Sequence, residues 1–210
     1  MMSQLALFGA TGRVGRRILA GALASGHAVR ALVRDPQALP AGPGLDVVLG
    51  DVLVLDDVRQ ALHGADGVLS TLGGGTTAAP GTARSQGMRN IVSAMEALGI
   101  ERIVALGGAG VLDADSDTGL RSEREGYPER FKRVSAEHLS ACRALQGSGL
   151  AWTFVGPPDI PDGDATGQYR VCADRFPAMG KALFTGDLAA FMLEELTARR
   201  FVGHRVGIAT

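Results

Sequence analysis

An α/β fold built on a doubly wound parallel sheet is predicted by three observations. Short apolar runs of strand length alternate with amphipathic helical patterns along the chain. The first run, residues 4–8, leads at once into a glycine-rich turn and a helical pattern. Three helical patterns end at a glycine, namely Gly26, Gly99 and Gly147. Strand alternating with helix implies parallel strands joined by right-handed crossovers, so we expect a three-layer αβα arrangement with helices on both faces.

The N-terminal half supplies four of the expected strands and two of the helices. Short apolar runs predict strands at residues 4–8, 28–33, 46–51 and 66–72. Val14, Ile18 and Ala22 recur at the spacing of one helical face, which predicts a helix that ends near Gly26. A second helix is expected over about residues 55–63.

The C-terminal half continues the alternation and then becomes less regular. A long helix before Gly99 is indicated by its apolar face, which carries Met88, Ile91, Val92, Met95 and Leu98. Strands are expected at 102–106 and 151–156, on either side of a helix marked by Leu139, Cys142 and Leu145. The remaining expectations are a loop at 157–167, a strand within 168–173, a helix at 187–198 and a final strand at 204–209. The polar stretch 113–130 is expected to form a loop beside the site.

Length and composition bound the function. A chain of 210 residues suits one domain, residues 1–210, with a small substrate-side region at about 156–186. A net charge of -1 gives no field that would attract nucleic acid or an acidic membrane. No apolar run reaches the roughly 18 residues of a membrane helix, so we expect a cytoplasmic protein. We also expect a monomer or weak dimer whose partner is a small-molecule substrate. Cys142 and Cys172 lack metal or redox spacing, which predicts reduced core thiols and no metal site.

The glycine turn is the first candidate site. Sheets of this class bind ligands at the carboxyl ends of their strands, where residues 9–15, 34, 51, 72–75, 107–110 and 157–160 are expected. Gly9, Gly12 and Gly15 form a G-x-x-G-x-x-G turn between strand and helix. Such a turn presents backbone N–H groups and a helix dipole to phosphate, and its last glycine lets the helix pack on the strand. We therefore expect a Rossmann-like nucleotide site, the alternative being a tight corner without a ligand.

Arg34, at the end of the second strand, indicates the preferred nucleotide. Proteins that bind NAD usually have an acidic residue there for the ribose 2′-hydroxyl. A guanidinium suits the two charges of the 2′-phosphate of NADP(H) instead. Arg13 could reach the same phosphate, and Asp35 could serve a ribose. Asp51 either borders the adenine together with Val52 or caps a turn.

Longer stretches resemble a known family. They are "FGATGRVG", "LVRDPQALP", "GDVLVLDDV", "SQGMRNIVSAMEALG" and "SGLAWTFVGPPDIPDGDATGQYRV", in order over about residues 4–208. Together they resemble the atypical short-chain dehydrogenase/reductases. Within that family they are most similar to the NADPH-dependent flavin reductases, also called biliverdin-IXβ reductases, and their bacterial NAD(P)H-binding relatives. The Met-Arg-Asn-Ile-Val helix and the proline loop after the sixth strand are the most specific of these stretches.

The resemblance implies NADP(H) as the cofactor and gives the matching residues roles. The pyrophosphate would lie on Gly9, Thr11, Gly12, Arg13 and Val14. Arg34 would hold the 2′-phosphate, Asp51 and Val52 the adenine, and Leu72 and Gly73 the ribose side. Gly15, Gly107 and Pro157 complete the cofactor side, whereas Gly108, Asp159 and Ile160 would face the substrate.

The chain departs from that family at three positions. Gly108 stands where the flavin reductases carry a serine near the nicotinamide. Asp159 stands where they carry a histidine, and Ala38 where a second arginine helps to hold the 2′-phosphate.

No catalytic acid is identified from the sequence. The Tyr-x-x-x-Lys pair of typical short-chain dehydrogenases is missing, because Tyr127 and Lys132 are five residues apart with Pro128 between them. The four histidines are expected to be surface or packing residues; they are His27, His63, His138 and His204.

Flat, conjugated acceptors fit a site without a positioned acid, because conjugation spreads the incoming charge and solvent can protonate the product. Three glycines follow the fifth expected strand, namely Gly107, Gly108 and Gly110. They either leave room for a flat ring against the nicotinamide, or only allow the nicotinamide to approach the strand closely or the chain to turn. Asp159 either binds a substrate amine or hydroxyl or caps its loop. The leading hypothesis is an NADPH-dependent reductase of a flavin, quinone or tetrapyrrole-like acceptor. The alternatives are an NADP(H)-binding, redox-sensing regulator of the NmrA-like type, which turns nothing over, and a sugar-nucleotide epimerase or dehydratase.

Overall fold

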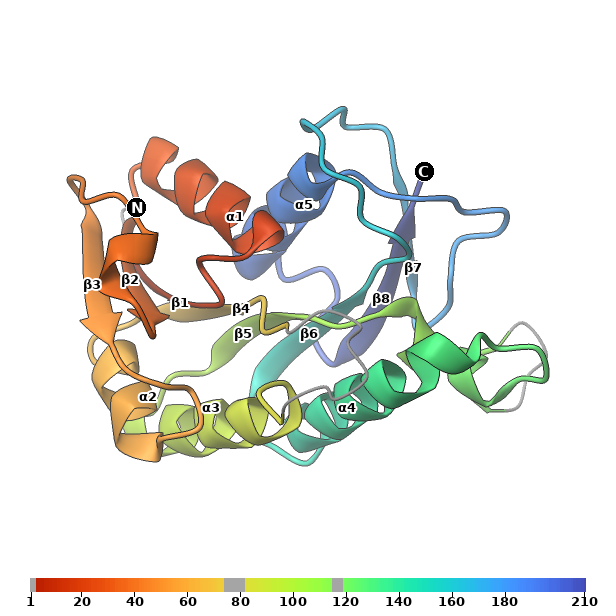
Figure 1. Ribbon diagram of the computed structural model, residues 1–210, viewed down its shortest axis with the longest axis horizontal. Helices are drawn as coiled ribbons and strands as arrows, with labels where there is room; N and C mark the ends of the chain where they lie inside the picture. Colours follow the sequence, from red (N-terminus) through yellow and green to blue (C-terminus); the bar gives the residue numbers. More distant parts are fainter. Residues whose placement is uncertain (1–2, 74–81, 115–118) are drawn as a thin grey trace.

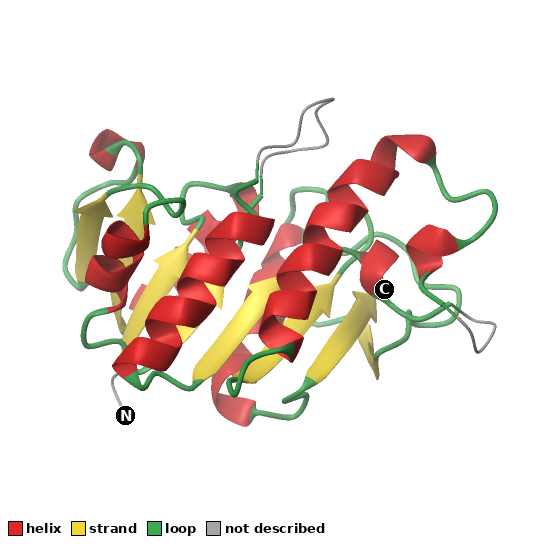
Figure 2. Ribbon diagram, turned by 90° about the horizontal axis from the view of Figure 1, so that it is seen from below, coloured by secondary structure: helices red, strands yellow, loops and turns green. Residues whose placement is uncertain are grey.

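The computed structural model describes residues 3–73, 82–114 and 119–210, and these form a single eight-stranded sheet. The strand order is β3-β2-β1-β4-β5-β6-β8-β7. The strands are β1 (Gln4–Phe8), β2 (Ala28–Val33), β3 (Leu45–Leu49), β4 (Gly67–Ser70), β5 (Arg102–Leu106), β6 (Ala151–Gly156), β7 (Arg170–Ala173) and β8 (His204–Ala209). All neighbours pair in parallel except β7, which runs antiparallel to β8 at the edge. The arrowheads of the parallel strands therefore lie at one edge of the sheet (Figure 2).

Within the described residues, five α-helices cover the two faces, as the predicted αβα layering requires. They are α1 (Arg13–Ala24), α2 (Leu55–Leu62), α3 (Ser85–Leu98), α4 (Glu129–Gln146) and α5 (Thr185–Ala198). Helices α1 and α5 lie on one face, and α2, α3 and α4 lie on the other (Figure 1). Each helical layer buries its own apolar cluster against the sheet. One cluster contains Phe8 and Phe154, and the other contains Leu7 and Phe191.

The strand order reverses between β1 and β4, and this reversal positions the site. From β1 the chain builds outward through β2 to β3, then returns to β4 on the other side of β1. Crossovers that leave in opposite directions open a crevice beyond the carboxyl ends of the two central strands. The structure thus confirms the doubly wound fold, and the residues that follow β1, β4, β5 and β6 meet at this edge.

The observed boundaries differ from the expected ones by a few residues, for local reasons. Strand β3 stops at Leu49 because the next residues turn away: the amide of Asp51 donates to the Asp57 carboxylate, 2.8 Å away. Helix α3 begins at Ser85, ahead of its first expected apolar residue. The stretch predicted as one loop, 113–130, contains a short 3-10 turn at Arg121–Glu123 and the start of α4, and residues 115–118 lie outside the described residues.

The expectation for the cysteines is right for one and wrong for the other. Cys142 is fully buried in α4, and burial raises the pKa of its thiol to about 12. Cys172 is only half-buried because it lies on the edge strand β7 rather than in the core. Both cysteines are free thiols. Within the described part of the chain, none of the helices has the length and apolar character needed to cross a membrane.

Candidate active site

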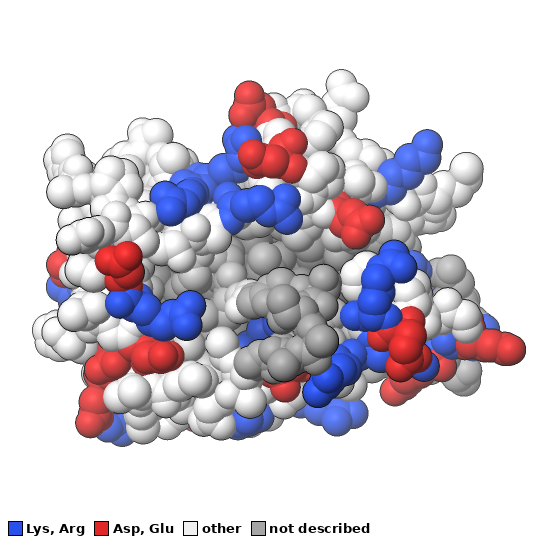
Figure 3. Space-filling view, in the orientation of Figure 1, with Lys and Arg blue, Asp and Glu red and all other residues white. Residues whose placement is uncertain are grey.

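Two neighbouring hollows lie at the carboxyl edge of the sheet. The first, here called the β1–β4 cleft, has a volume of about 440 Å³. Its lining residues are Phe8, Gly9, Thr11, Gly12, Leu32, Val33, Arg34, Gly50, Asp51, Val52, Leu53, Thr71, Leu72, Gly73 and Ala83. The second, here called the β5–β6 cavity, has a volume of about 530 Å³. Its lining includes Arg13, which directly follows Gly12 of the first hollow in the chain. Figure 3 shows this face of the molecule hollowed near its middle, with Lys and Arg side chains on the rim.

The glycine turn has the geometry of a phosphate cradle. Gly9 has φ +83°, and a Cβ there would lie 2.6 Å from the carbonyl oxygen of Thr71. A Cβ at Gly15 would collide with the Gly9 carbonyl oxygen, so this glycine lets α1 pack directly on the turn. A Cβ at Gly12 would meet only the Gly9 oxygen, at 3.4 Å. Gly12 is also the N-cap of α1 and contributes no side-chain cap, which leaves the first-turn amides available to an anion.

Arg34 and Asp35 have separate roles at the end of β2. Arg34 is exposed and lines the β1–β4 cleft. Asp35 is the N-cap of the 3-10 turn Pro36–Ala38, and its carboxylate accepts a hydrogen bond from the Gln37 amide, 2.9 Å away. Asp35 is therefore used as a turn cap, and the cation is the group presented to the cleft.

Asp51 combines the two roles that the sequence left open. Its Oδ1 atom accepts a hydrogen bond from the Leu53 amide at 2.9 Å, which caps the turn after β3. Asp51 also lines the β1–β4 cleft, next to Val52. The carbonyl of Val52 accepts a hydrogen bond from Asn90 Nδ2 at 2.9 Å, so α3 fixes the backbone of this wall.

Glycines after β5 shape the second hollow. The β5–β6 cavity is lined by Arg13, Arg84, Gly107, Gly108, Ala109, Gly110, Arg121, Tyr127, Pro128, Phe131, Val134, Ser135, His138, Pro157, Pro158, Asp159 and Ile160. A Cβ at Gly107 would collide with the Phe154 ring, so this glycine is needed for packing. A Cβ at Gly108 would lie 3.4 Å from the imidazole of His138, which is ordinary contact. Gly108 therefore has room for a small side chain, and Gly107 has none.

His138 faces the cavity from α4. Its ring packs edge-on against Phe154, with centroids 6.4 Å apart. Burial, assisted by the nearby positive charge of Arg84, lowers the pKa of His138 to about 3. The imidazole is therefore neutral at physiological pH and can serve as a hydrogen-bond partner rather than as a cation. The packing role expected for His138 agrees with its contact with Phe154. The sequence did not indicate that the His138 ring lies beside Gly108.

The loop after β6 closes the cavity on the side of α1. The Arg13 guanidinium donates to the Ile160 carbonyl at 2.8 Å, which links the glycine turn to the proline loop. Asp159 is exposed, and among the described residues its carboxylate accepts no hydrogen bond from the loop. The expected loop cap is therefore not Asp159. Asp162 instead joins this loop to the start of α5, because its carboxylate accepts a hydrogen bond from the Thr185 hydroxyl at 2.7 Å.

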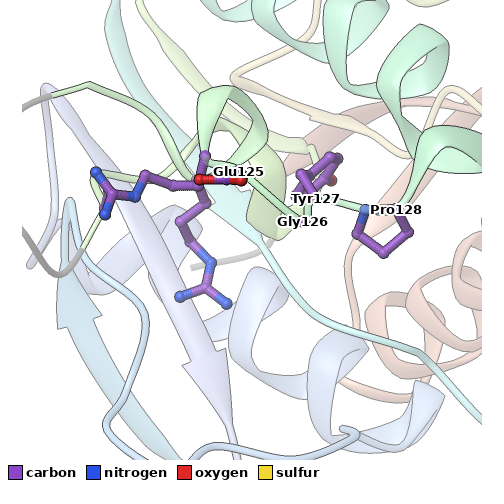
Figure 4. A pocket seen from close by; sticks show the side chains of 7 residues that line it. Glu125, Gly126, Tyr127 and Pro128 are labelled. Atoms are coloured by element: carbon purple, nitrogen blue, oxygen red, sulfur yellow. The ribbon is translucent and has the colours of Figure 1, made fainter.

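Tyr127 lies where the loop before α4 reaches the cavity. Figure 4 shows Tyr127 beside Pro128 and Gly126, at the wall shared with a smaller neighbouring pocket of about 320 Å³. Its hydroxyl is 2.8 Å from the Oγ atom of Ser135 on α4. Lys132 instead pairs with Glu129, with 2.7 Å between Nζ and Oε2. Tyr127 and Lys132 thus form no dehydrogenase pair.

Most of the residues singled out in the sequence meet at these two hollows. The β1–β4 cleft contains Gly9, Thr11, Gly12, Arg34, Asp51, Val52, Leu72 and Gly73. The β5–β6 cavity contains Arg13, Gly107, Gly108, Pro157, Asp159 and Ile160. Val14 and Gly15 line neither hollow, because they are buried where α1 packs on the turn. Gly74 and Gly75 lie outside the described residues.

Sequence reasoning missed one wall of the cavity. Arg84 directly precedes α3, and Ser135 and His138 are on α4; no motif marks these positions. One signal was available: Ser135 and His138 are three residues apart, so they share a helical face. Only the packing of α4 beside the end of β5 shows that this face meets the site.

Replacing His138 should reduce the acid sensitivity of the fold. Between pH 6.5 and pH 3 the unfolded chain protonates this histidine and the folded chain does not, so stability falls as the pH drops below 6.5. We expect the loss of unfolding free energy between pH 7 and pH 5 to be smaller in His138→Gln by about 2 kcal/mol. Urea unfolding at both pH values measures this difference, with the exposed His63→Gln as control. An equal loss in wild type and His138→Gln would refute the prediction.

The comparisons with known proteins agree with this geometry. The family described as NAD(P)H-binding matches residues 9–199. A 3-beta-hydroxysteroid dehydrogenase from Mycolicibacterium neoaurum is 30% identical over 147 residues, which is 65% of this chain and 40% of that protein. A (4-alkanoyl-5-oxo-2,5-dihydrofuran-3-yl)methyl phosphate reductase from Streptomyces griseus is 33% identical over 153 residues, 71% of this chain and 45% of that protein. The chain spans less than half the length of these two relatives.

Solved structures match the chain over nearly all of its length. A proposed exported protein from Burkholderia pseudomallei has a TM-score of 0.86 and 30% identity, and covers 100% of both chains. The anaerobillin reductase ChuY from Escherichia coli O157:H7 has a TM-score of 0.81 and 26% identity, over 98% of this chain and 97% of that one. A proposed NADH-flavin reductase from Streptococcus pneumoniae has a TM-score of 0.83, 24% identity and 99% coverage of both chains, which shows the shared fold. These findings confirm the resemblance drawn from the sequence.

Proposed function

The chain belongs to the NAD(P)H-binding family, and from that premise we propose that it is an NADPH-dependent reductase of a flat, conjugated acceptor such as a flavin, a quinone or a linear tetrapyrrole. The observation that carries the proposal is the pairing of the two hollows. The β1–β4 cleft is lined by the glycine turn, which suits a phosphate, and by the exposed Arg34. The neighbouring β5–β6 cavity has a wall of glycines and is large enough for a ring system.

The residues of the β1–β4 cleft fit a dinucleotide. The turn leaves an open approach at Gly12 and first-turn amides without a side-chain cap, which suits a pyrophosphate. Among the described residues, no carboxylate pairs with the Arg34 guanidinium, so it can bind a 2′-phosphate. When bound, the reduced nicotinamide supplies a hydride.

The β5–β6 cavity then positions the acceptor. Gly108 allows a ring to lie close to the end of β5, and the Arg13 bond to Ile160 holds the proline loop on the opposite side. Arg84 and Arg121 add positive charge to the lining, which favours an acceptor that gains negative charge. The similarity to a protein that reduces anaerobillin supports an extended conjugated acceptor.

A direct test is to follow NADPH oxidation spectroscopically with FMN, FAD, 9,10-phenanthrenequinone and biliverdin as separate acceptors. We expect turnover above the uncatalysed background with at least one of them. Cofactor binding without turnover of any acceptor would refute the reductase and would favour the regulator.

Gly108→Ser should change turnover only modestly if ring placement supplies most of the rate. The new hydroxyl would enter the space beside His138, where it could add one hydrogen bond or crowd the ring. We expect a change in kcat with FMN of less than about tenfold in either direction, equivalent to about 1.4 kcal/mol of barrier. Steady-state kinetics measure this change, with Gly149→Ser as an exposed control. A rise of several hundredfold would instead show that the wild type lacks an essential side chain.

A further inference from the structure

We propose that the smaller pocket beside the β5–β6 cavity binds a phosphate or carboxylate group on an arm of the acceptor, so that acceptors with such an arm are preferred over neutral acceptors with the same ring. This pocket, here called the Arg121–Arg124 pocket, has a volume of about 320 Å³ and is lined by residues 124–128, Arg121 and Ala114. The inference rests on the proposed function and adds to it a binding subsite and the charge that this subsite selects.

The Arg121–Arg124 pocket adjoins the space proposed for the acceptor ring. Arg121, Tyr127 and Pro128 line both hollows, so these side chains stand at the boundary between them. Figure 4 shows Tyr127 and Pro128 next to each other on this wall. An arm attached to a ring in the β5–β6 cavity therefore enters the pocket past the Arg121 guanidinium.

Two guanidinium groups give the pocket its charge. Arg121 and Arg124 line it together with one carboxylate, that of Glu125. Among the residues that the structure describes, neither arginine forms an ion pair, and the nearby Glu123 carboxylate instead accepts a hydrogen bond from the Leu120 amide at 2.8 Å. Because a guanidinium binds phosphate or carboxylate through two N–H groups at once, this pair of cations suits an anionic group.

Arg121 is held through both its backbone and its side chain. Its amide donates to the Leu112 carbonyl at 2.9 Å, which ties the 3-10 turn Arg121–Glu123 to the segment that follows Gly108. Its guanidinium carbon lies 4.6 Å from the centre of the Phe176 ring. A ring over one face of a guanidinium leaves the N–H groups in its plane available to an anion. The first cation that the arm meets is therefore already positioned, which reduces the side-chain entropy lost on binding.

Arg124 separates contacts with the arm from contacts with the ring. It lines the Arg121–Arg124 pocket but not the β5–β6 cavity. Its amide donates to the Arg121 carbonyl at 3.3 Å, and its carbonyl accepts from the Tyr127 amide at 3.1 Å, so the backbone of this wall is hydrogen-bonded on both sides. A change of the Arg124 side chain therefore reports on the arm alone.

FMN and riboflavin provide the test, because they share one ring and differ in the phosphate at the end of the arm. Arg124→Gln should raise KM for FMN about fivefold, the effect of one exposed charge pair, and change KM for riboflavin by less than about 1.5-fold. Arg143→Gln is the matched control, because Arg143 is exposed near the end of α4 and lines neither hollow. An equal rise in KM for both flavins in Arg124→Gln would overturn the inference.

A double variant and a second pair of acceptors identify the anionic group. Wild type should favour FMN over riboflavin about tenfold in kcat/KM, and Arg121→Gln/Arg124→Gln should favour it less than about twofold. The ratio cancels any effect of Arg121 on the shared ring. Biliverdin and its dimethyl ester make the same comparison for a carboxylate. Loss of the preference in the flavin pair alone assigns the pocket to phosphate, loss in the tetrapyrrole pair alone assigns it to carboxylate, and loss in neither overturns the inference.

Equilibrium binding distinguishes failure of this inference from failure of the proposed function. NADP⁺ is present throughout, because it prevents turnover and fills the β1–β4 cleft, where the phosphate of FMN would otherwise compete. Titrations followed by flavin fluorescence or biliverdin absorbance should show tighter binding of the charged member of a pair, and the difference should shrink as salt is raised to about 500 mM. If wild type separates neither pair by affinity, the inference is overturned even where an acceptor is reduced. A preference in binding without NADPH oxidation supports the pocket and refutes the reductase.

Discussion

Gly12→Val should abolish binding of the dinucleotide and leave the protein folded. At this position φ is -72°, which any residue adopts, and a Cβ would meet only the Gly9 oxygen at 3.4 Å. The branched side chain would instead project into the β1–β4 cleft and keep phosphate away from the first-turn amides of α1. Two lost charge-assisted hydrogen bonds correspond to a decrease in affinity of more than about 100-fold.

Isothermal titration with NADPH measures the loss, and thermal unfolding shows that the fold is retained. Two other glycines make the result specific. Gly42→Val should change neither property, because Gly42 is exposed and a Cβ there meets nothing within 4 Å. Gly15→Val should unfold the protein, because its Cβ would collide with the turn. Normal NADPH affinity in a folded Gly12→Val would mean that the turn is only a structural corner.

The first hollow could be predicted from the sequence because local rules determine it. A strand, a glycine turn and a helix are contiguous in the chain, and the parallel sheet brings the ends of neighbouring strands to one edge. Gly9, Gly12 and Arg34 follow directly from such patterns, and all three line the β1–β4 cleft. The geometry of Gly15 also agrees with the packing role expected for the last glycine of the turn.

The second hollow could be predicted only in part, because long-range packing forms much of its wall. Tyr127 and Ser135 meet across the start of α4, and they reach the site only because α4 packs beside the end of β5. The sequence indicated that Tyr127 and Lys132 do not form a dehydrogenase pair, and the structure agrees. No short-range pattern showed that Ser135 is the partner of that tyrosine.

Arg34→Ala should remove a preference for NADPH over NADH. Arg34 is exposed at the end of β2 and lines the β1–β4 cleft, whereas Asp35 is engaged by the Gln37 amide and does not face it. A guanidinium that binds a 2′-phosphate through charge-assisted hydrogen bonds contributes about 1.5–3 kcal/mol. Wild type should therefore bind NADPH about 10- to 150-fold more tightly than NADH.

The variant should bind the two cofactors within about threefold of each other, because the 2′-phosphate is the only group that distinguishes them and NADH makes no use of Arg34. Titration of wild type, Arg34→Ala and Arg59→Ala with both cofactors gives the ratio of the NADH and NADPH dissociation constants for each protein. Arg59→Ala is the control, because Arg59 is on α2 and pairs with Asp56. Since Arg34 is exposed, the wild-type preference should also shrink as salt is raised from 50 to about 500 mM, where the Debye length falls to a few ångströms. Equal affinities in wild type would show that this cation does not select the nucleotide, and the chain would then be assigned as binding NADH and NADPH without preference.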